Sequence, residues 1–212
     1  MDKIKTLVFA GGQIHDYKSC GAAAREILKG DGRFDVTYVE EDLNVLTALK
    51  PYEVIVFYYT VGEIATSQKN GLLEWVASGK GYAGFHSAAD SFRGCPEYRA
   101  MVGGYFVTHP RYRDYQVTIT DVEHPITKGL IEADPKEFTV KDEMYVTSYD
   151  ARNHVLARAL WQDGTVPVAW VKDWGKGRVY WLALGHDGPA CKHEMFGKLL
   201  VRGAVWAARG GQ

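Results

Sequence analysis

The first half of the chain alternates short apolar runs with amphipathic segments. The apolar runs are rich in Val, Ile, Phe and Tyr, as is typical of strands buried on both faces of a sheet. They span residues 5–11, 34–40, 52–59 and 81–86, and helical patterns occupy residues 20–30 and 65–78. This alternation predicts a doubly wound α/β fold, in which a mostly parallel sheet is flanked by helices.

From about residue 95 the pattern changes. A loop-rich stretch with at most one short helix precedes closely spaced strand patterns. These patterns cover residues 116–120, 138–145 and 154–160. We expect them to form a small antiparallel extension of the sheet. A hairpin with its turn at Gly175-Lys176-Gly177 follows, and one final helix is predicted from about Pro189 to Arg209.

Length and composition narrow the class of function. A chain of 212 residues without an evident linker predicts one domain, residues 1–212. Its 25 Lys and Arg residues balance 26 Asp and Glu residues, so we expect no nucleic-acid partner. The first apolar run is too short for a signal peptide or a membrane span, and the three cysteines show no disulfide or metal-binding spacing. We therefore expect a cytoplasmic protein with a small-molecule ligand and no membrane partner.

The segment Gly84-Phe85-His86-Ser87 spans the end of a predicted strand and resembles the sharp strand-to-helix turn that carries the nucleophile of α/β hydrolases. That turn normally presents Ser or Cys, whereas its apex here is His86. Imidazole is a common ligand of divalent metals. We therefore interpret the turn as the support of a metal ligand or a general base.

Two further histidines follow predicted strands. His15 and Asp16 come after the first strand, and His186 and Asp187 come after the last. Because the carboxyl ends of parallel strands meet at one edge of a sheet, we expect these side chains to approach His86. Asp16 or Asp187 would then orient a histidine, which makes Asp187 a candidate catalytic residue.

The middle of the chain adds His109 and Glu143. We predict a divalent metal held by His86 and His186 together with His15 or His109, and the donor types do not distinguish zinc, manganese, iron and nickel. Glu143 is the predicted general base, and His86 and His186 are also candidate catalytic groups. The predicted substrate-binding residues are His15, Asp16, His109 and Tyr145.

Other motifs are weaker. Residues 79–84 match G-x-G-x-x-G, but the glycines precede and form a strand rather than open a helix, so no nucleotide cofactor is expected. Ser87 could act as a nucleophile with His186 as its base, although a capping role at the helix start is the simpler interpretation. A two-carboxylate glycosidase is disfavoured because only Glu143 is singled out as an acid.

Several blocks in one order resemble the ThuA-like family, named for trehalose utilisation. They include "GYAGFHSAADSF", "MVGGYFVTHP", "KDEMYV" and "PVAWVKDWGKGRVYWLALGHD", and the resemblance covers nearly the whole chain. It implies a class I glutamine amidotransferase-like, flavodoxin-like fold. In that fold His86 occupies the position of the nucleophilic cysteine and His186 that of the catalytic histidine. Glutamine hydrolysis is not expected, because the thiol is missing.

The same resemblance implies a bacterial enzyme of carbohydrate catabolism. Its substrate would be a trehalose-type disaccharide or the 3-keto derivative of one, which it would hydrolyse or isomerise. A non-catalytic sugar-binding or regulatory protein is the alternative, since a fold does not fix a function. A homodimer is left open by the aromatic residues in the middle of the chain.

Overall fold

A large mixed sheet runs through the molecule, whose computed structural model describes residues 2–210. One half of the sheet is parallel. It consists of β1 (Ile4–Gly12), β2 (Phe34–Glu40), β3 (Val54–Thr60), β4 (Gly81–Phe85) and β11 (Gly177–Leu182). These strands lie in the order β2-β1-β3-β4-β11, and each is parallel to its neighbours.

The other half of the sheet is antiparallel. It consists of β10 (Gly164–Trp174), β9 (His154–Trp161), β6 (Arg113–Ile119) and β7 (Glu137–Asp142). These strands continue the sheet beyond β11 in that order. Two short strands, β5 (Gly104–Thr108) and β8 (Val146–Tyr149), pair with each other in a separate small sheet.

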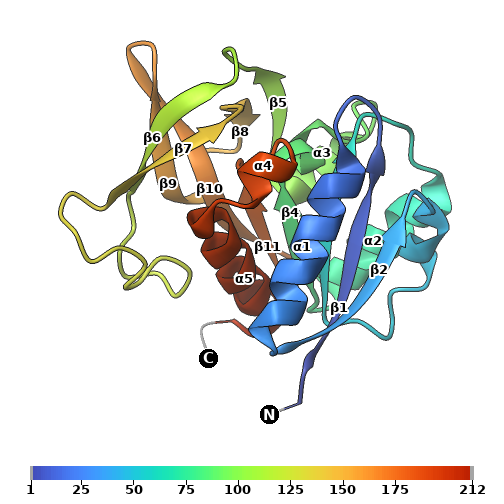
Figure 1. Cartoon of the computed structure of the whole chain (residues 1–212). Helices are drawn as coiled ribbons and strands as arrows, with labels where there is room; N and C mark the ends of the chain where they lie inside the picture. The colour runs from blue at the N-terminus through green and yellow to red at the C-terminus, as the bar shows by residue number, and fades with distance from the viewer. Residues whose placement is uncertain (1, 211–212) are drawn as a thin grey trace.

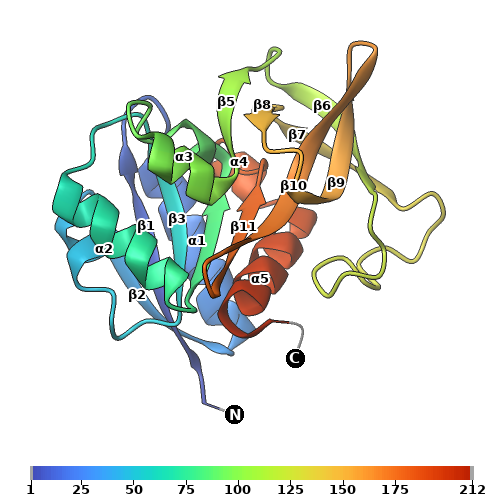
Figure 2. The ribbon, with the colours of Figure 1, turned by 180° about the vertical axis from the view of Figure 1, so that it is seen from behind.

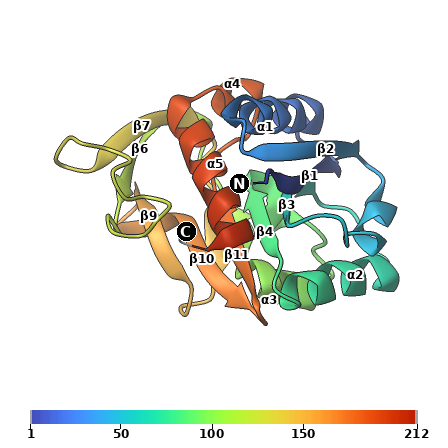
Figure 3. The same cartoon turned by 90° about the horizontal axis from the view of Figure 1, so that it is seen from below.

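Helices cover both faces of the parallel half. One group consists of α1 (Tyr17–Asp31), α4 (Gly188–Cys191) and α5 (Glu194–Arg209), and the other of α2 (Thr66–Ala77) and α3 (Pro96–Val102). The first group lies in front of the sheet in Figure 1 and the second faces the viewer in Figure 2. Seen from below, the sheet lies between these two layers (Figure 3). The predicted doubly wound architecture is thus confirmed, with its antiparallel extension on one side.

The core explains why the strands form where they do. The apolar run Val54–Tyr58 is fully buried, as are all five residues of β4. Such continuous burial requires helices on both faces, which the α/β alternation supplies. Helix α5 packs so closely on β11 that a Cβ at Gly203 would lie 2.0 Å from the ring of Tyr180.

Three local features differ from the predictions. The final helix is not continuous, because His193 caps α5 by accepting a hydrogen bond from the backbone N–H of Met195 (3.1 Å). Strands β5 and β8 were not predicted. Strand β7 ends at Asp142, so Glu143 and Tyr145 lie beyond it rather than within a strand.

In the described part of the chain, every helix is too short or too polar to cross a bilayer.

Candidate metal centre

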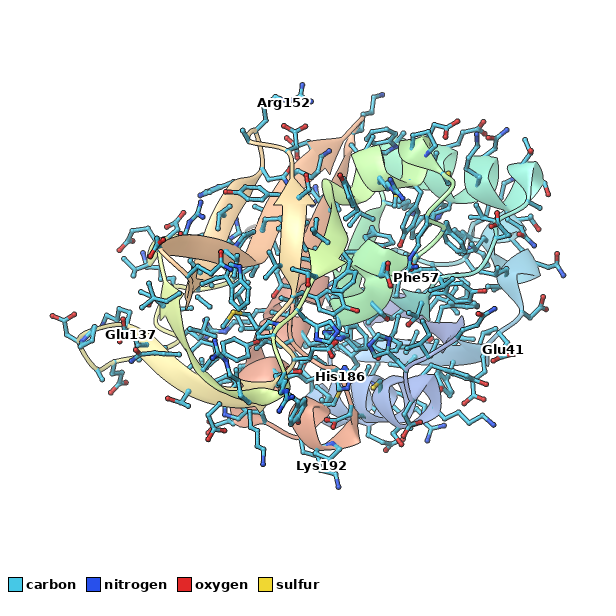
Figure 4. The ribbon with its side chains drawn as sticks, turned by 90° about the horizontal axis from the view of Figure 1, so that it is seen from above. Glu41, Phe57, Glu137, Arg152, His186 and Lys192 are labelled. Atoms are coloured by element: carbon cyan, nitrogen blue, oxygen red, sulfur yellow. The ribbon has the colours of Figure 1, made fainter. Side chains whose placement is uncertain are left out.

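Four side chains from distant parts of the sequence meet at one edge of the sheet. His15 follows β1, His86 follows β4, His186 follows β11 and Glu143 follows β7. One ligand atom from each lies within 4.8 Å of those of the other three. We call these four residues the His3Glu cluster. Figure 4 looks down on this edge, and His186 lies near its centre, between the parallel half and the antiparallel extension.

His86 is held rigidly at the end of β4. Its φ of 41° places it in the left-handed region, and the short 3-10 helix η2 (His86–Asp90) begins with it, as the predicted strand-to-helix turn requires. The ring is fully buried, and its Nδ1 donates a hydrogen bond to the carbonyl oxygen of Ala183 (2.8 Å). Because a carbonyl only accepts, this bond fixes the tautomer and leaves a lone pair on Nε2. That lone pair faces the cluster.

The other two histidines also present one ring nitrogen to Glu143. His15 Nδ1 lies 3.0 Å from the hydroxyl of Thr60, which holds the ring with Nε2 3.7 Å from Glu143 Oε2. His186 Nδ1 lies 3.2 Å from the same carboxylate oxygen and 3.3 Å from His86 Nε2. Three ring nitrogens therefore surround Oε2, with His86 Nε2 at 3.5 Å.

Asp142 fixes the loops that carry two members of the cluster, and it was not predicted. Its buried carboxylate accepts three backbone N–H groups. Oδ1 accepts from Glu143 (2.7 Å) and from His186 (3.1 Å), and Oδ2 accepts from Gly185 (2.7 Å). Gly185 has a φ of 102°, and a Cβ there would also lie 2.6 Å from Phe196, so glycine is required at this turn. The one available sequence signal was the Asp142-Glu143 pair within the strand predicted over residues 138–145.

Strained backbone also gathers at this edge. Besides His86, the non-glycine residues Ile14, Val61 and Phe92 have φ values of 74°, 63° and 48°. Two of them are β-branched, for which this region costs most. Ile14 precedes His15 in the β1–α1 loop, and Val61 follows β3 and bonds through its N–H to the carbonyl of Asp90 (3.0 Å). Such strain is characteristic of functional sites held by a rigid scaffold.

Burial and mutual contact set the charges of the cluster. Burial lowers the pKa of His86 to about 4, against the hydrogen bond with Glu143, so this ring is neutral. Burial alone would raise the pKa of Glu143, but contacts with His15, His186 and His86 outweigh it and hold the pKa far below its usual range. For His186, burial favours a lower pKa, yet the Glu143 carboxylate prevails and raises it.

This donor set fits a divalent cation. His86 Nε2 and Glu143 Oε2 are both acceptors, they lie 3.5 Å apart, and the proton of His186 Nδ1 would have to serve both of them. A cation among the four ligand atoms removes that conflict. Three imidazoles with one carboxylate suit zinc, manganese, iron or nickel. The Ala183 carbonyl and Thr60 hydroxyl orient two of the rings, as second partners of metal-bound histidines do.

His109 and Tyr145 lie around the cluster rather than in it. His109 Nδ1 is 3.0 Å from the other carboxylate oxygen of Glu143, Oε1, and 2.8 Å from the carbonyl of Pro110, and its side chain is 42% exposed. Tyr145 is buried, with its ring centroid 3.9 Å from that of His86. Between His15 and His109, therefore, the geometry favours His15 as the third imidazole.

The two aspartates assigned to histidine orientation have other roles. Asp16 caps α1 by accepting the N–H of Ser19 (3.1 Å). Asp187 caps α4 by accepting the N–H of Ala190 (2.8 Å), and it also accepts the hydroxyl of Tyr112 (3.3 Å). Within residues 2–210 neither carboxylate hydrogen-bonds a histidine ring, so the structure shows helix capping and leaves histidine orientation by these residues a prediction. An aspartate just before a helix equally satisfies the free N–H groups of its first turn.

Ser87 lies inside η2, so the predicted cap is wrong, and its buried Oγ has no hydrogen-bond partner within residues 2–210. A nucleophilic serine needs an adjacent base, and none is in contact here. We expect Ser87→Ala to raise the free energy of unfolding by about 1 kcal/mol, because it removes an unpaired buried hydroxyl. Urea denaturation measures this change.

Ser91→Ala is the matched control, since Ser91 Oγ donates to the carbonyl of Tyr59 (2.6 Å) and its removal should be destabilising. A fluorophosphonate probe should leave the wild-type protein unlabelled. Labelling at Ser87, or a loss of stability in Ser87→Ala, would show that the hydroxyl has a partner in solution.

Comparisons with known proteins agree with this architecture. The family model for ThuA, described as trehalose utilisation, matches residues 5–207. A crystal structure of a ThuA-like protein from Parabacteroides merdae aligns with a TM-score of 0.89 and 25% identity, covering 99% of this chain and 91% of that one. For a ThuA-like protein from Bacteroides uniformis, the TM-score is 0.81 and the identity 20%, with 97% and 91% covered.

A more distant likeness concerns the fold alone. A β-galactosidase from Bacillus circulans sp. alkalophilus aligns with a TM-score of 0.62 and 12% identity, covering 96% of this chain but 31% of the enzyme. No curated protein matches the sequence.

Proposed function

Because this chain belongs to the ThuA family of trehalose utilisation, we propose that it is a metal-dependent enzyme of carbohydrate catabolism. Its substrate would be a trehalose-type disaccharide or the 3-keto derivative of one, which it hydrolyses or isomerises. One observation supports the metal dependence. Two hydrogen-bond acceptors, His86 Nε2 and Glu143 Oε2, lie 3.5 Å apart, and ligand atoms of His15 and His186 lie close to both. The carbohydrate substrate is inferred from membership of the ThuA family.

In this proposal His15, His86, His186 and Glu143 hold the ion. When bound, such an ion polarises a substrate oxygen or lowers the pKa of a water molecule. We assign Glu143 to the ion rather than to proton transfer, which revises its expected role as a general base. Its Oε2 is shared by the three histidines and its Oε1 contacts His109, so little of the carboxylate is free to take a proton.

His109 is the better candidate for proton transfer. Its ring is partly exposed and can exchange protons with solvent, while Nδ1 is held against Glu143 Oε1 and the carbonyl of Pro110. A partly exposed histidine in contact with the cluster is placed to serve as a general acid or base. Tyr145 supports the ring of His86 from within the core.

The remaining expectations belong to this proposal as well. Cys20, Cys95 and Cys191 are buried free thiols, which fits a reducing cytoplasm. A small carbohydrate is the proposed partner. A sugar-binding protein without turnover is the second candidate, and it would bind the sugar without the ion.

The proposal is tested by metal content. We expect protein purified without an affinity tag to hold about one divalent ion per chain, and the His86→Ala, His186→Ala double variant to hold almost none. Inductively coupled plasma mass spectrometry measures both. His154→Ala is the control, because His154 pairs with Asp121 (2.8 Å) and belongs to no part of the cluster.

Two outcomes would count against it. Wild-type protein that stays free of metal after soaking with zinc, manganese, nickel or iron would overturn the metal dependence. Full metal content in the double variant would place the ion elsewhere.

A further inference from the structure

A cavity of about 510 Å³ lies at the edge of the sheet opposite the His3Glu cluster. Trp174 and Trp206 both line it, and we call it the Trp206 cavity. Trp174 pairs with Gly177 at the start of β11, whereas His186 lies beyond the end of that strand. The six residues of β11 span about 17 Å, so the Trp206 cavity is separate from the proposed ion. Figure 4 likewise shows Arg152, which lines this cavity, well apart from His186.

Aromatic rings form much of the wall of the Trp206 cavity. The ring of His124, from the β6–β7 loop, lies 5.3 Å from that of Trp206 in α5 and 5.5 Å from that of His154 in β9. Trp174 at the end of β10 adds a fourth ring, which is fixed because its Nε1 donates to the carbonyl of Leu73 (3.2 Å). All four rings belong to half-buried or exposed residues, so ring surface is open to a ligand. Aromatic faces take up apolar surface such as the C–H face of a sugar.

The loop that carries His124 is held in one position. The carboxylate of Asp121 accepts the backbone N–H of His124 (3.1 Å) and pairs with Nε2 of His154 (2.8 Å). From α5, Arg202 Nη1 donates to the backbone carbonyl of Lys128 (2.8 Å), which ties the same loop to the helix. The aromatic wall is therefore formed before a ligand arrives, which lowers the entropic cost of binding.

Two polar groups of the lining lack partners within residues 2–210. His124 Nδ1 accepts the backbone N–H of Ile126 (3.2 Å), so the neutral ring carries its proton on Nε2, which has no acceptor. Burial, together with His154, lowers the pKa of His124 and keeps this ring neutral. Asn153 is 7% exposed, and its Nδ2 donates to the carbonyl of Gly103 (2.7 Å), while its Oδ1 has no donor. A ligand with hydroxyl groups, which both donate and accept, matches these two groups.

The charges of the lining cancel. Arg152 Nε donates to Asp150 Oδ1 (3.0 Å) and Arg152 Nη2 to Asp150 Oδ2 (2.6 Å), so each side chain neutralises the other. Lys172 and Asp173 add one charge of each sign. A neutral ligand with several hydroxyl groups therefore fits better than an anion or a cation. The volume of about 510 Å³ also lies within the range of about 300–1,000 Å³ for small-molecule sites.

We propose that the Trp206 cavity binds a neutral saccharide, with the sugar ring against the aromatic wall, at a site independent of the ion. The proposed function concerns the His3Glu cluster alone, so this site goes beyond it. The protein would then hold saccharides at two opposite edges of its sheet.

The test counts the trehalose molecules bound per chain by isothermal titration calorimetry. The His86→Ala, His186→Ala double variant has no intact cluster, so it should bind one trehalose. Adding Trp206→Leu or His124→Asn should weaken this binding at least about tenfold. Asparagine in place of His124 keeps an acceptor for the N–H of Ile126 but removes the ring and the Nε2 donor. Wild-type protein stripped of its ion by a chelator repeats the measurement without a substitution in the cluster.

Two variants serve as matched controls. Trp161→Leu removes a half-buried tryptophan at the other end of the β9–β10 hairpin. His193→Asn replaces another histidine whose Nδ1 accepts a backbone N–H, that of Met195 (3.1 Å). Neither residue lines the cavity, so both substitutions should leave trehalose affinity unchanged.

Three results would overturn the site. They are the absence of trehalose binding from both the double variant and the stripped wild-type protein, an affinity that neither Trp206→Leu nor His124→Asn changes, and tighter binding of adenosine than of trehalose. Metal content separates this proposal from the proposed function. Metal-free wild-type protein that keeps one trehalose site contradicts only the proposed function, whereas full metal content with no trehalose bound by the double variant or the stripped protein contradicts only the site in the Trp206 cavity.

Discussion

The substitution Asp142→Asn is expected to weaken ion binding by about 10- to 100-fold and to lower the free energy of unfolding by about 2 kcal/mol. In the wild-type protein, three backbone N–H groups point at the two carboxylate oxygens of Asp142. An amide places an NH2 group where one oxygen was. It would then face the N–H of Gly185 or those of Glu143 and His186, donor against donor. Both ligand-bearing loops would shift.

Removal of a buried charge offsets part of this loss. Burial raises the pKa of Asp142 to about 6, although the N–H groups of Gly185, Glu143 and His186 favour the ionised form. The expected effect on stability is therefore moderate, whereas the expected effect on ion affinity is large, because two of the four proposed ligands would move.

Unfolding in urea and competition with a chromogenic chelator measure the two effects. Asp187→Asn is the matched control, since asparagine caps a helix as well as aspartate does, and both quantities should stay near wild type. Ser91→Ala should be destabilised but keep its ion affinity, because the Ser91 hydroxyl bonds to the carbonyls of Tyr59 and Ser87 and to no ligand residue. An Asp142→Asn variant with wild-type affinity would show that Asp142 does not position the cluster.

Removal of the ion with a chelator is expected to lower the free energy of unfolding by about 4 kcal/mol, relative to protein with free ion at about a thousand times its Kd. For a chain of this size the midpoint of thermal unfolding would fall by about 10 °C. The effect is large because the ligands come from four separate segments, and a site assembled only in the folded state adds its binding energy to folding.

Differential scanning calorimetry measures this shift. The His86→Ala, His186→Ala double variant should unfold at the same temperature with and without the ion. Equal midpoints for wild-type protein in the two conditions would mean that the cluster binds no ion in solution.

Much of the parallel half could be predicted from the sequence. The central strands β1, β3 and β4 are mostly buried, so each appears as a nearly unbroken apolar run, and the predicted bounds of β1 to β4 differ from the observed ones by at most two residues. The convergence of His15, His86 and His186 followed from the same topology, because parallel strands bring their carboxyl ends to one edge.

The antiparallel extension was predicted, but the contacts that its residues make at the site were not, and the reason is physical. Strand β7 ends at Asp142, and what Asp142 and Glu143 contact depends on Gly185 and His186, more than 40 residues away in sequence. No local sequence pattern predicts hydrogen bonds between residues so far apart in the chain. The choice between His15 and His109 was left open by the sequence for the same reason, since the β5–β6 loop is placed by strand β5, which was not predicted.

Asp16 and Asp187 show a different difficulty. A carboxylate between a strand and a helix can orient a neighbouring side chain or cap the helix, and the two roles have one sequence signature. In the structure both aspartates cap helices. An aspartate that is next to a histidine in sequence therefore need not contact the imidazole ring.

The histidines of the cluster come from buried strands, whereas the residues around the cluster come from an exposed strand and loop. His15, His86 and His186 lie within four residues of the ends of β1, β4 and β11, and a change in the backbone position of these buried strands would disturb the whole core. Tyr105, His109 and Tyr112 belong to one exposed strand and the loop after it, away from that core. Under the proposed function, variation between residues 105 and 112 would change which sugar is bound without moving the three histidines, and mutant libraries that seek a new substrate should begin there.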